Sequence, residues 1–117
     1  MKFSIVKKAA LCAAVAGLGL GMSARAAEPG ITDSTIKIGL FSPLSGSGMA
    51  YGFDVVNAAK MYYEKVNKEG GIHGRKIELV VEDTRCNAND LVAAVKKLVE
   101  QDHVFLLNGG PCSAAVS

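Results

Sequence analysis

Hydrophobic and polar positions change their period several times along the chain after residue 35. The apolar run Ile36–Phe41 is short and bounded by turn residues, which predicts a strand. From Phe53 to Lys68 the apolar residues recur with helical spacing, which predicts a helix. Gly70 and Gly71 are expected to end it. The predicted inner face of this helix consists of Val55, Ala58, Ala59, Tyr62 and Val66.

A second strand, a second helix and a third strand are expected to follow. The second strand is Lys76–Glu82, and Asn87 is a good N-cap residue for the second helix. The run Val104–Leu107 is apolar at every position, which predicts a third strand covered on both faces. The predicted inner face of the second helix consists of Val92, Val95, Leu98 and Val99.

The β-α-β-α-β order is typical of an α/β fold, and it predicts the start of a Rossmann-like lobe with a parallel sheet. The first and third strands can be neighbours in this topology. Three parallel strands leave two bare edges, and so small a sheet would be marginally stable. We therefore expect residues 27–117 to be the first part of a larger lobe rather than a complete small domain.

The first 26 residues have the pattern of a secretory signal peptide. Lys2, Lys7 and Lys8 precede the apolar stretch Ala9–Met22, and small residues follow in Ala24–Ala26. A membrane anchor is the alternative. However, a helix over this stretch would span about 21 Å, short of the ~30 Å hydrocarbon core. We therefore expect residues 1–26 to be cleaved and the mature protein to be periplasmic.

Charge and cysteine content limit the kinds of partner and cofactor that the chain is expected to bind. Residues from Glu28 onward carry nine basic and eleven acidic side chains, a net charge of −2, which argues against a nucleic-acid partner. Cys86 and Cys112 form an even pair in an exported chain, which favours a disulfide over two buried thiols. His73 and His103 lack metal-ligand spacing to the cysteines, so no metal is expected.

Ligands of open parallel sheets bind beyond the carboxyl ends of the strands. The segments there are Ser42–Gly52, Asp83–Asn87 and Asn108–Ser113. A hydroxyl and free N–H groups at Ser113 suit a carboxylate, although a plain helix N-cap fits this position equally well. Tyr51 could cover an apolar ligand side chain, or it could pack on its own domain.

The glycines at positions 46, 48 and 52 resemble a dinucleotide-binding fingerprint, but the spacing is one residue too long. They could simply permit a tight turn, or the loop could offer groups such as the Ser45 hydroxyl to a small polar ligand. No nucleophile and base occur in a recognisable arrangement. The sequence therefore predicts neither a cofactor nor an enzyme, although a secreted Rossmann-like enzyme stays the third possibility.

Several short motifs together are characteristic of one family. They are Ile36-Lys37-Ile38-Gly39, Pro43-Leu44-Ser45-Gly46, Tyr51-Gly52, Asn67 through Lys76, Glu82-Asp83, Cys86 and Cys112-Ser113. With these motifs, residues 33–117 resemble the periplasmic substrate-binding proteins of branched-chain amino acid ABC transporters, which have the type I periplasmic binding fold.

The resemblance implies two α/β lobes that close on a ligand, with residues 27–117 as a partial N-terminal lobe. It implies a Cys86–Cys112 disulfide, and it implies that Ser113 binds the ligand carboxylate through its hydroxyl and backbone. It also implies that Tyr51 borders the side-chain pocket. The predicted ligand-binding residues are Ser113, Tyr51, Ser45, Cys112 and Ala114.

The expected function is capture of a branched-chain amino acid or similar small carboxylate, followed by delivery to inner-membrane permease subunits of an ABC importer. Amino-acid binders often continue with Ser or Thr after the serine that matches Ser113, whereas this chain has Ala114 and Ala115. A ligand-sensing receptor domain of the same fold, binding an amide, urea or aromatic acid, is the alternative.

Overall fold

A computed structural model describes residues 28–109 and 112–113. The predicted signal peptide 1–26, residues 110–111 and Ala114 lie outside the described residues. The order of strands and helices confirms the β-α-β-α-β prediction. The elements are β1 (Thr35–Ser42), α1 (Met49–Lys68), β2 (Lys76–Asp83), α2 (Ala88–Lys96), the π-helical turn η1 (Lys97–Gln101) and β3 (Leu106–Gly109).

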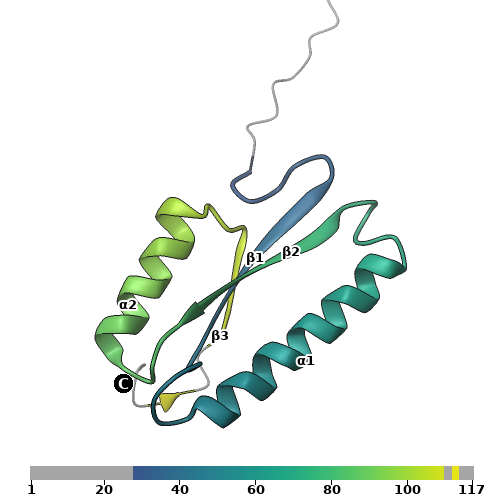
Figure 1. The fold of residues 1–117 in the computed structure, drawn as a ribbon. Helices are drawn as coiled ribbons and strands as arrows, with labels where there is room; N and C mark the ends of the chain where they lie inside the picture. The colour runs from purple at the N-terminus through teal and green to yellow at the C-terminus, as the bar shows by residue number, and fades with distance from the viewer. Residues whose placement is uncertain (1–27, 110–111, 114–117) are drawn as a thin grey trace, which may run out of the picture.

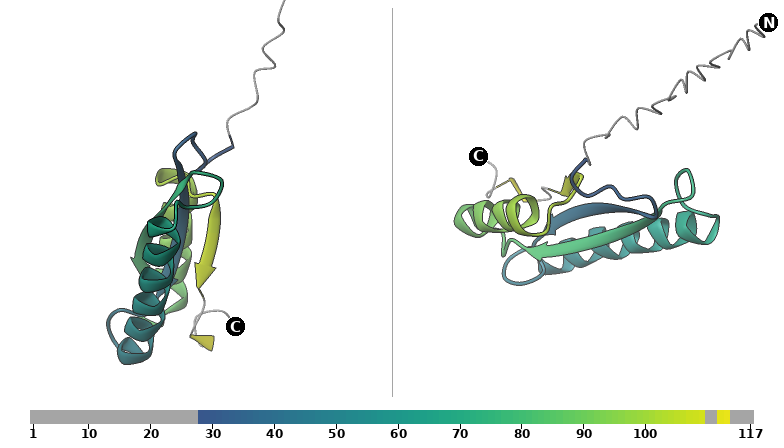
Figure 2. Two further views of the ribbon diagram at one scale, coloured as in Figure 1. Left: turned by 90° about the vertical axis from the view of Figure 1, so that its right-hand side faces the viewer. Right: turned by 90° about the horizontal axis from the view of Figure 1, so that it is seen from above.

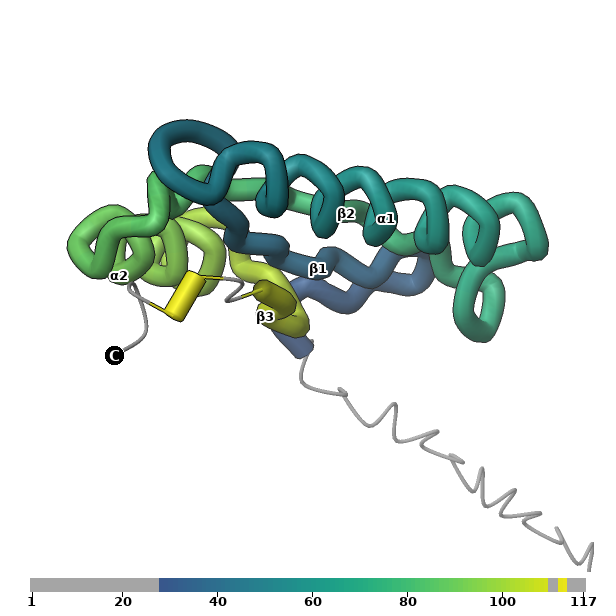
Figure 3. The backbone as a smooth tube through the Cα atoms, turned by 90° about the horizontal axis from the view of Figure 1, so that it is seen from below, coloured from purple at the N-terminus to yellow at the C-terminus, as the bar shows by residue number. Residues whose placement is uncertain are grey.

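The strands form a parallel sheet in the order β2-β1-β3, so β1 and β3 are neighbours, as the β-α-β-α-β topology allows. Thr35 pairs with Lys76 at one end of the β1–β2 ladder, and Phe41 pairs with Gly109 at the end of the β1–β3 ladder. Helices α1 and α2 lie on opposite sides of the sheet (Figure 1; Figure 2). The tube view shows β1 between the two outer strands (Figure 3).

Helix α1 begins at Met49, so the predicted start at Phe53 is wrong. Gly48 is the N-cap residue, with φ 94°, a conformation that glycine adopts without a steric penalty. A Cβ atom at Gly52 would overlap the carbonyl oxygen of Pro43. Glycine therefore allows the first turn of α1 to lie directly against the chain that leaves β1. These backbone roles account for two of the glycines without a cofactor.

The inner face of α1 is rotated from the predicted one. Val56 is buried at 3% exposure, while Ala58 and Tyr62 are exposed, Tyr62 at 63%. The prediction for these two residues was wrong, but Val55, Ala59 and Val66 are at least half-buried as expected. Valine stands at both 55 and 56, so the sequence pattern alone fits inner faces that differ by one helical step of 100°.

Helix α2 begins as predicted, since the Asn87 side chain accepts a hydrogen bond from the backbone N–H of Asn89 at 2.8 Å. Its buried residues are Ala94 and, in η1, Leu98. A Cβ atom at Gly39 would lie 3.2 Å from Leu98, so Leu98 packs against the centre of β1. Val92 and Val99, which we expected inside, are 55% and 48% exposed.

Strand β3 starts later than predicted, at Leu106 instead of Val104. Val104 is buried ahead of the strand, while Phe105 and Leu106 are 47% and 51% exposed. The expectation of a strand covered on both faces is therefore wrong for the described part of the chain. The reason is that α1 packs against β1 and β2 and leaves one face of β3 uncovered.

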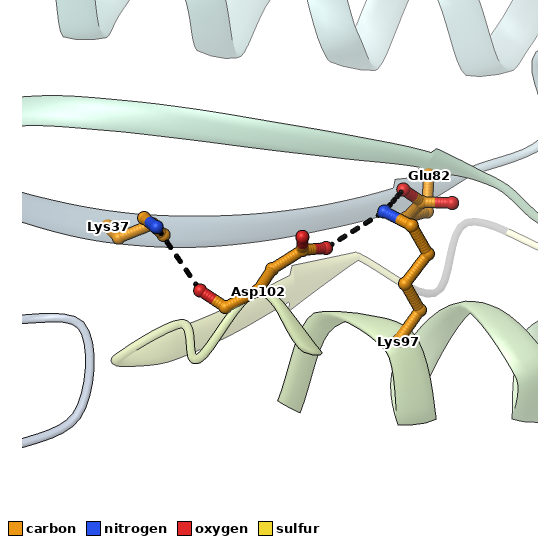
Figure 4. Close-up of polar contacts among 4 residues, drawn as sticks. All are labelled: Lys37, Glu82, Lys97 and Asp102. Atoms are coloured by element: carbon orange, nitrogen blue, oxygen red, sulfur yellow. Dashed lines mark hydrogen bonds and ion pairs between the residues drawn. The ribbon is translucent and has the colours of Figure 1, made fainter. Parts of the chain in front are cut away.

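A polar network fastens the end of α2 and η1 to the sheet (Figure 4). The ammonium group of Lys97 lies 2.5 Å from a carboxylate oxygen of Glu82 in β2 and 2.9 Å from that of Asp102. Hydrogen bonds to Glu82 and then Asp102 raise the pKa of Lys97. Lys37 of β1 donates to the Asp102 carbonyl oxygen at 3.2 Å. The start of η1 at Lys97 and the residue after it, Asp102, are thereby tied to β2 and β1.

In the part of the chain that the structure describes, no helix combines the length and apolar character needed to cross a bilayer.

Candidate functional site

The segments that follow the strands gather at the carboxyl edge of the sheet, as expected for parallel strands. In Figure 1 the β1–α1 loop, the β2–α2 turn and the short segment at residues 112–113 meet at the lower left. We call this region, made of residues 42–52, 83–87 and 112–113, the carboxyl edge. This region carries four of the five predicted ligand-binding residues.

Asp83 organises the β1–α1 loop from the end of β2. Its carboxylate accepts hydrogen bonds from the backbone N–H of Leu44 at 2.8 Å, from the Ser45 hydroxyl at 2.5 Å and from the backbone N–H of Arg85 at 2.8 Å. Burial acts to raise the pKa of Asp83. The hydrogen bonds from Ser45, Arg85 and Leu44 outweigh that effect and hold the pKa below its usual range. The group is therefore an ionised acceptor at neutral pH.

The base of the carboxyl edge is buried and fully hydrogen-bonded. Ser42 has 0% exposure, and its hydroxyl donates to the Gly52 carbonyl oxygen at 3.2 Å. The Ser42 carbonyl oxygen accepts from the backbone N–H of Thr84 at 3.0 Å, and Thr84 is only 2% exposed. These bonds fix the points from which the β1–α1 loop and the β2–α2 turn leave the sheet.

A disulfide joins Cys86 to Cys112, with the two Cα atoms 5.6 Å apart, which confirms the predicted pairing. Cys86 follows the outer strand β2 and Cys112 follows the outer strand β3, while β1 lies between them. The bridge therefore spans the carboxyl end of the central strand. It holds Ser113, the next residue in the chain, at the same edge as the β1–α1 loop.

The predicted site residues differ in what surrounds them. Ser45 is half-buried and donates its hydroxyl proton to Asp83. Tyr51 lies in the first turn of α1 with 61% exposure, and Ser113 is exposed beside the bridge at Cys112. The carboxyl edge thus brings Ser45, Cys112 and Ser113 together through the β2–α2 turn. Their contacts with a ligand stay predictions, as does the role of Ala114.

Asp83, at the centre of this edge, was not among the predicted site residues. The available signal was an acidic residue at the carboxyl end of an apolar strand. The loop after the neighbouring strand contains a serine, Ser45, that can donate a hydrogen bond to it. The sequence alone does not say which of the two adjacent acids, Glu82 or Asp83, bonds to the loop. The structure separates them, with Glu82 bonded to Lys97 and Asp83 bonded to the β1–α1 loop.

A small open cavity of about 150 Å³ lies beside the edge, between the end of β2 and α2. That volume is below the roughly 300–1,000 Å³ of ordinary ligand pockets. Within residues 28–109 and 112–113, no group of three His, Cys, Asp or Glu side chains is arranged to hold a metal ion. The cavity is lined by Glu82, Asp83, Arg85, Asp90, Ala93, Ala94 and Lys97.

Comparisons with known proteins agree on one family. The sequence profile described as periplasmic binding protein matches residues 35–117. A leucine-, isoleucine-, valine-, threonine- and alanine-binding protein of Pseudomonas aeruginosa is 34% identical over 98% of this chain and 29% of its own length.

Solved structures give the same result. The branched-chain amino acid transporter substrate-binding protein LivJ of Streptococcus pneumoniae, in complex with isoleucine, is 34% identical with a TM-score of 0.68. That match covers 71% of this chain and 24% of LivJ. A fatty acid ABC transporter substrate-binding protein of Thermomonospora curvata is 35% identical with a TM-score of 0.63, over 75% of this chain and 22% of its own. The chain therefore spans about a quarter of the length of these relatives.

Proposed function

The chain belongs to the type I periplasmic binding protein family, and we propose that it forms part of the carboxylate-binding site of an ABC importer's solute-binding protein. The proposed ligand is a branched-chain amino acid or a similar small carboxylate. In the full-length protein, residues 27–117 would be part of the N-terminal lobe. Residues 1–26 would direct export to the periplasm.

The observation that carries this proposal is the position of Ser113. The Cys86–Cys112 bridge holds the Ser113 segment at the carboxyl edge, beside the loop that bears Ser45. Ser113 offers a hydroxyl and a backbone N–H, and both are donors that a carboxylate accepts. It is exposed, so a ligand can reach it.

The ligands named for the similar proteins support a carboxylate in particular. LivJ is in complex with isoleucine, and the Thermomonospora curvata protein is described as a fatty acid transporter component. Isoleucine and a fatty acid share a carboxylate and an apolar chain, whereas only isoleucine has an α-ammonium group. The carboxylate is therefore the group that we assign to the carboxyl edge. Tyr51, with an exposed ring, is placed to cover the apolar chain.

Binding in this proposal is a shift between an open and a closed arrangement of two lobes. The carboxyl edge would contribute one wall, and the second lobe would contribute the other. The closed form would then be recognised by permease subunits in the inner membrane. The family is one of solute-binding proteins, and no covalent chemistry is assigned to the residues of the edge.

Isothermal titration calorimetry on the full-length, periplasmically produced protein tests the proposal. The probes are L-leucine, 4-methylpentanoate, benzoate and L-leucinol, which keeps the leucine side chain and amine but lacks the carboxylate. We expect one site for at least one carboxylate and no measurable binding of leucinol. Binding of leucinol as tightly as leucine, or of no carboxylate at all, would refute the assignment. Acetamide and urea serve as further probes, and binding of either one in place of every carboxylate would favour the sensor alternative.

A further inference from the structure

Glu82 and Asp83 are adjacent carboxylates at the end of β2 that bond to different parts of the structure. Glu82 pairs with Lys97 on the side of α2. Asp83 accepts hydrogen bonds from the backbone N–H of Leu44 and the hydroxyl of Ser45. The divergence follows from the alternation of side chains along a strand. Of the two acids, Asp83 alone is bonded to the loop that bears predicted ligand-binding residues.

The turn from Asp83 to Cys86 connects two fixed points. At its start, the Asp83 carboxylate holds the β1–α1 loop, and at its end Cys86 is bonded to Cys112. Arg85 and Cys86 both have left-handed backbone conformations, with φ of 49° and 55°. The backbone N–H of Arg85 donates to the same Asp83 carboxylate at 2.8 Å. The turn is therefore tight, and Asp83 bonds to both sides of it.

The β1–α1 loop also packs directly on this turn. A Cβ atom at Gly46 would lie 3.3 Å from the carbonyl oxygen of Arg85, so the loop backbone lies close against the turn. A displacement of the loop would therefore move the turn. Through the disulfide, it would also move the segment that carries Ser113.

We propose that Asp83 is the positioning residue of the carboxyl edge, holding the Ser45 loop and, through the Cys86–Cys112 bridge, the Ser113 segment in one arrangement. The relevance of this arrangement to a ligand rests on the proposed function. The loss of the Asp83 carboxylate would let the loop and the segment move independently. Ligand binding would then have to order them, which lowers the affinity.

The same geometry assigns a direction to Ser45. An ionised carboxylate can only accept hydrogen bonds, so the Ser45 hydroxyl proton is donated to Asp83. Toward a ligand, the Ser45 hydroxyl oxygen is then an acceptor. A ligand carboxylate would be repelled by this oxygen and by the Asp83 charge behind it. Ser113, and not Ser45, is therefore the serine that would bind the ligand carboxylate.

The first test measures backbone motion without a ligand. Hydrogen–deuterium exchange with mass spectrometry compares the full-length protein with its Asp83→Asn and Asp83→Ala variants. We expect exchange to accelerate about tenfold or more in peptides over residues 43–48 and also in peptides over residues 112–113. The matched control is Glu82→Gln, which removes the neighbouring carboxylate charge and weakens the pairing with Lys97 instead of the bonds to the β1–α1 loop.

The second test separates positioning from stability. Titration with L-leucine should show an affinity loss of about tenfold in Asp83→Asn, since an interaction with a charge is removed from the edge. Glu82→Gln should lower the urea midpoint while leaving the affinity unchanged. If Asp83→Ala does not fold, the Asp83→Asn comparison still decides, because Asn keeps an acceptor for Leu44.

Two results would overturn the positioning role. One is faster exchange confined to residues 43–48 in both Asp83 variants, with residues 112–113 unchanged. The other is the same exchange pattern in Glu82→Gln. A full-length protein that binds none of the carboxylate probes refutes the proposed function instead, and the exchange pattern then decides the positioning role by itself.

Discussion

Removal of the Cys86–Cys112 disulfide should destabilise the protein by a predictable amount. The two cysteines are 26 residues apart in the sequence. In the chain-entropy model, a loop of this length is worth about 3.5 kcal/mol at 25 °C, because the bridge restricts the unfolded chain. The left-handed backbone conformations of Arg85 and Cys86 cost energy, and the reduced protein can release part of it. We therefore expect a loss of about 2 to 3.5 kcal/mol.

The assay is equilibrium unfolding in urea of the full-length mature protein, with and without a reductant such as TCEP. The free energy of unfolding should fall by the stated amount on reduction. The Cys86→Ser/Cys112→Ser double variant should match the reduced wild-type protein and should not respond to the reductant. Equal stability of the oxidised and reduced proteins would refute the reasoning, as would a reductant effect in the double variant.

Four further changes have defined outcomes. Ser113→Ala should weaken binding of a carboxylate ligand by ~1–3 kcal/mol in calorimetry, because a donor to a charge is lost; an unchanged affinity would remove Ser113 from the site. Gly52→Ala should lower the free energy of unfolding by about 1–3 kcal/mol in urea despite the better helix propensity of alanine, since its Cβ meets the Pro43 carbonyl; a stabilised variant would contradict this. Asn67→Ala should cost ~1–3 kcal/mol of stability, because the Asn67 amide bonds both the N–H and the C=O of Ile77 at 2.7 and 2.9 Å. The lowered pKa of Asp83 stabilises the folded protein fully above its ordinary value of 3.8, and this contribution is lost as the pH falls through the folded-state pKa; Asp83→Asn should flatten that acid limb in pH-dependent urea melts, and an unchanged limb would assign it to other acids.

The order of elements was predictable because it depends on the spacing of apolar residues, and the β-α-β-α-β order then allowed β1 and β3 to be neighbours. The Cys86–Cys112 disulfide was predictable because two cysteines follow the expected signal peptide, and export of the chain would favour their pairing. The start of α1 was not predictable, because Gly46 and Gly48 suggest a loop when only the sequence is considered. The helix begins there because Gly48 takes the left-handed N-cap conformation and Gly52 fits against Pro43.

The errors in burial have a common physical origin. From a short apolar run alone, it cannot be predicted which of its residues pack against the neighbouring helix or sheet. Val104 is buried ahead of β3, while Leu106 is exposed within it, because α1 covers β1 and β2 only. Ala94 is buried in place of Val92, since the close packing of α2 on the sheet is decided by shape as well as by hydrophobicity.

A crystal structure of the full-length protein with a bound carboxylate ligand, such as L-leucine, tests the central claim most directly. The account predicts that a carboxylate oxygen of the ligand lies within about 3.2 Å of the Ser113 hydroxyl or backbone N–H. It also predicts that Asp83 still holds Leu44 and Ser45 behind the ligand. A ligand carboxylate bound away from residues 112–113, with the carboxyl edge in open solvent, would contradict the account.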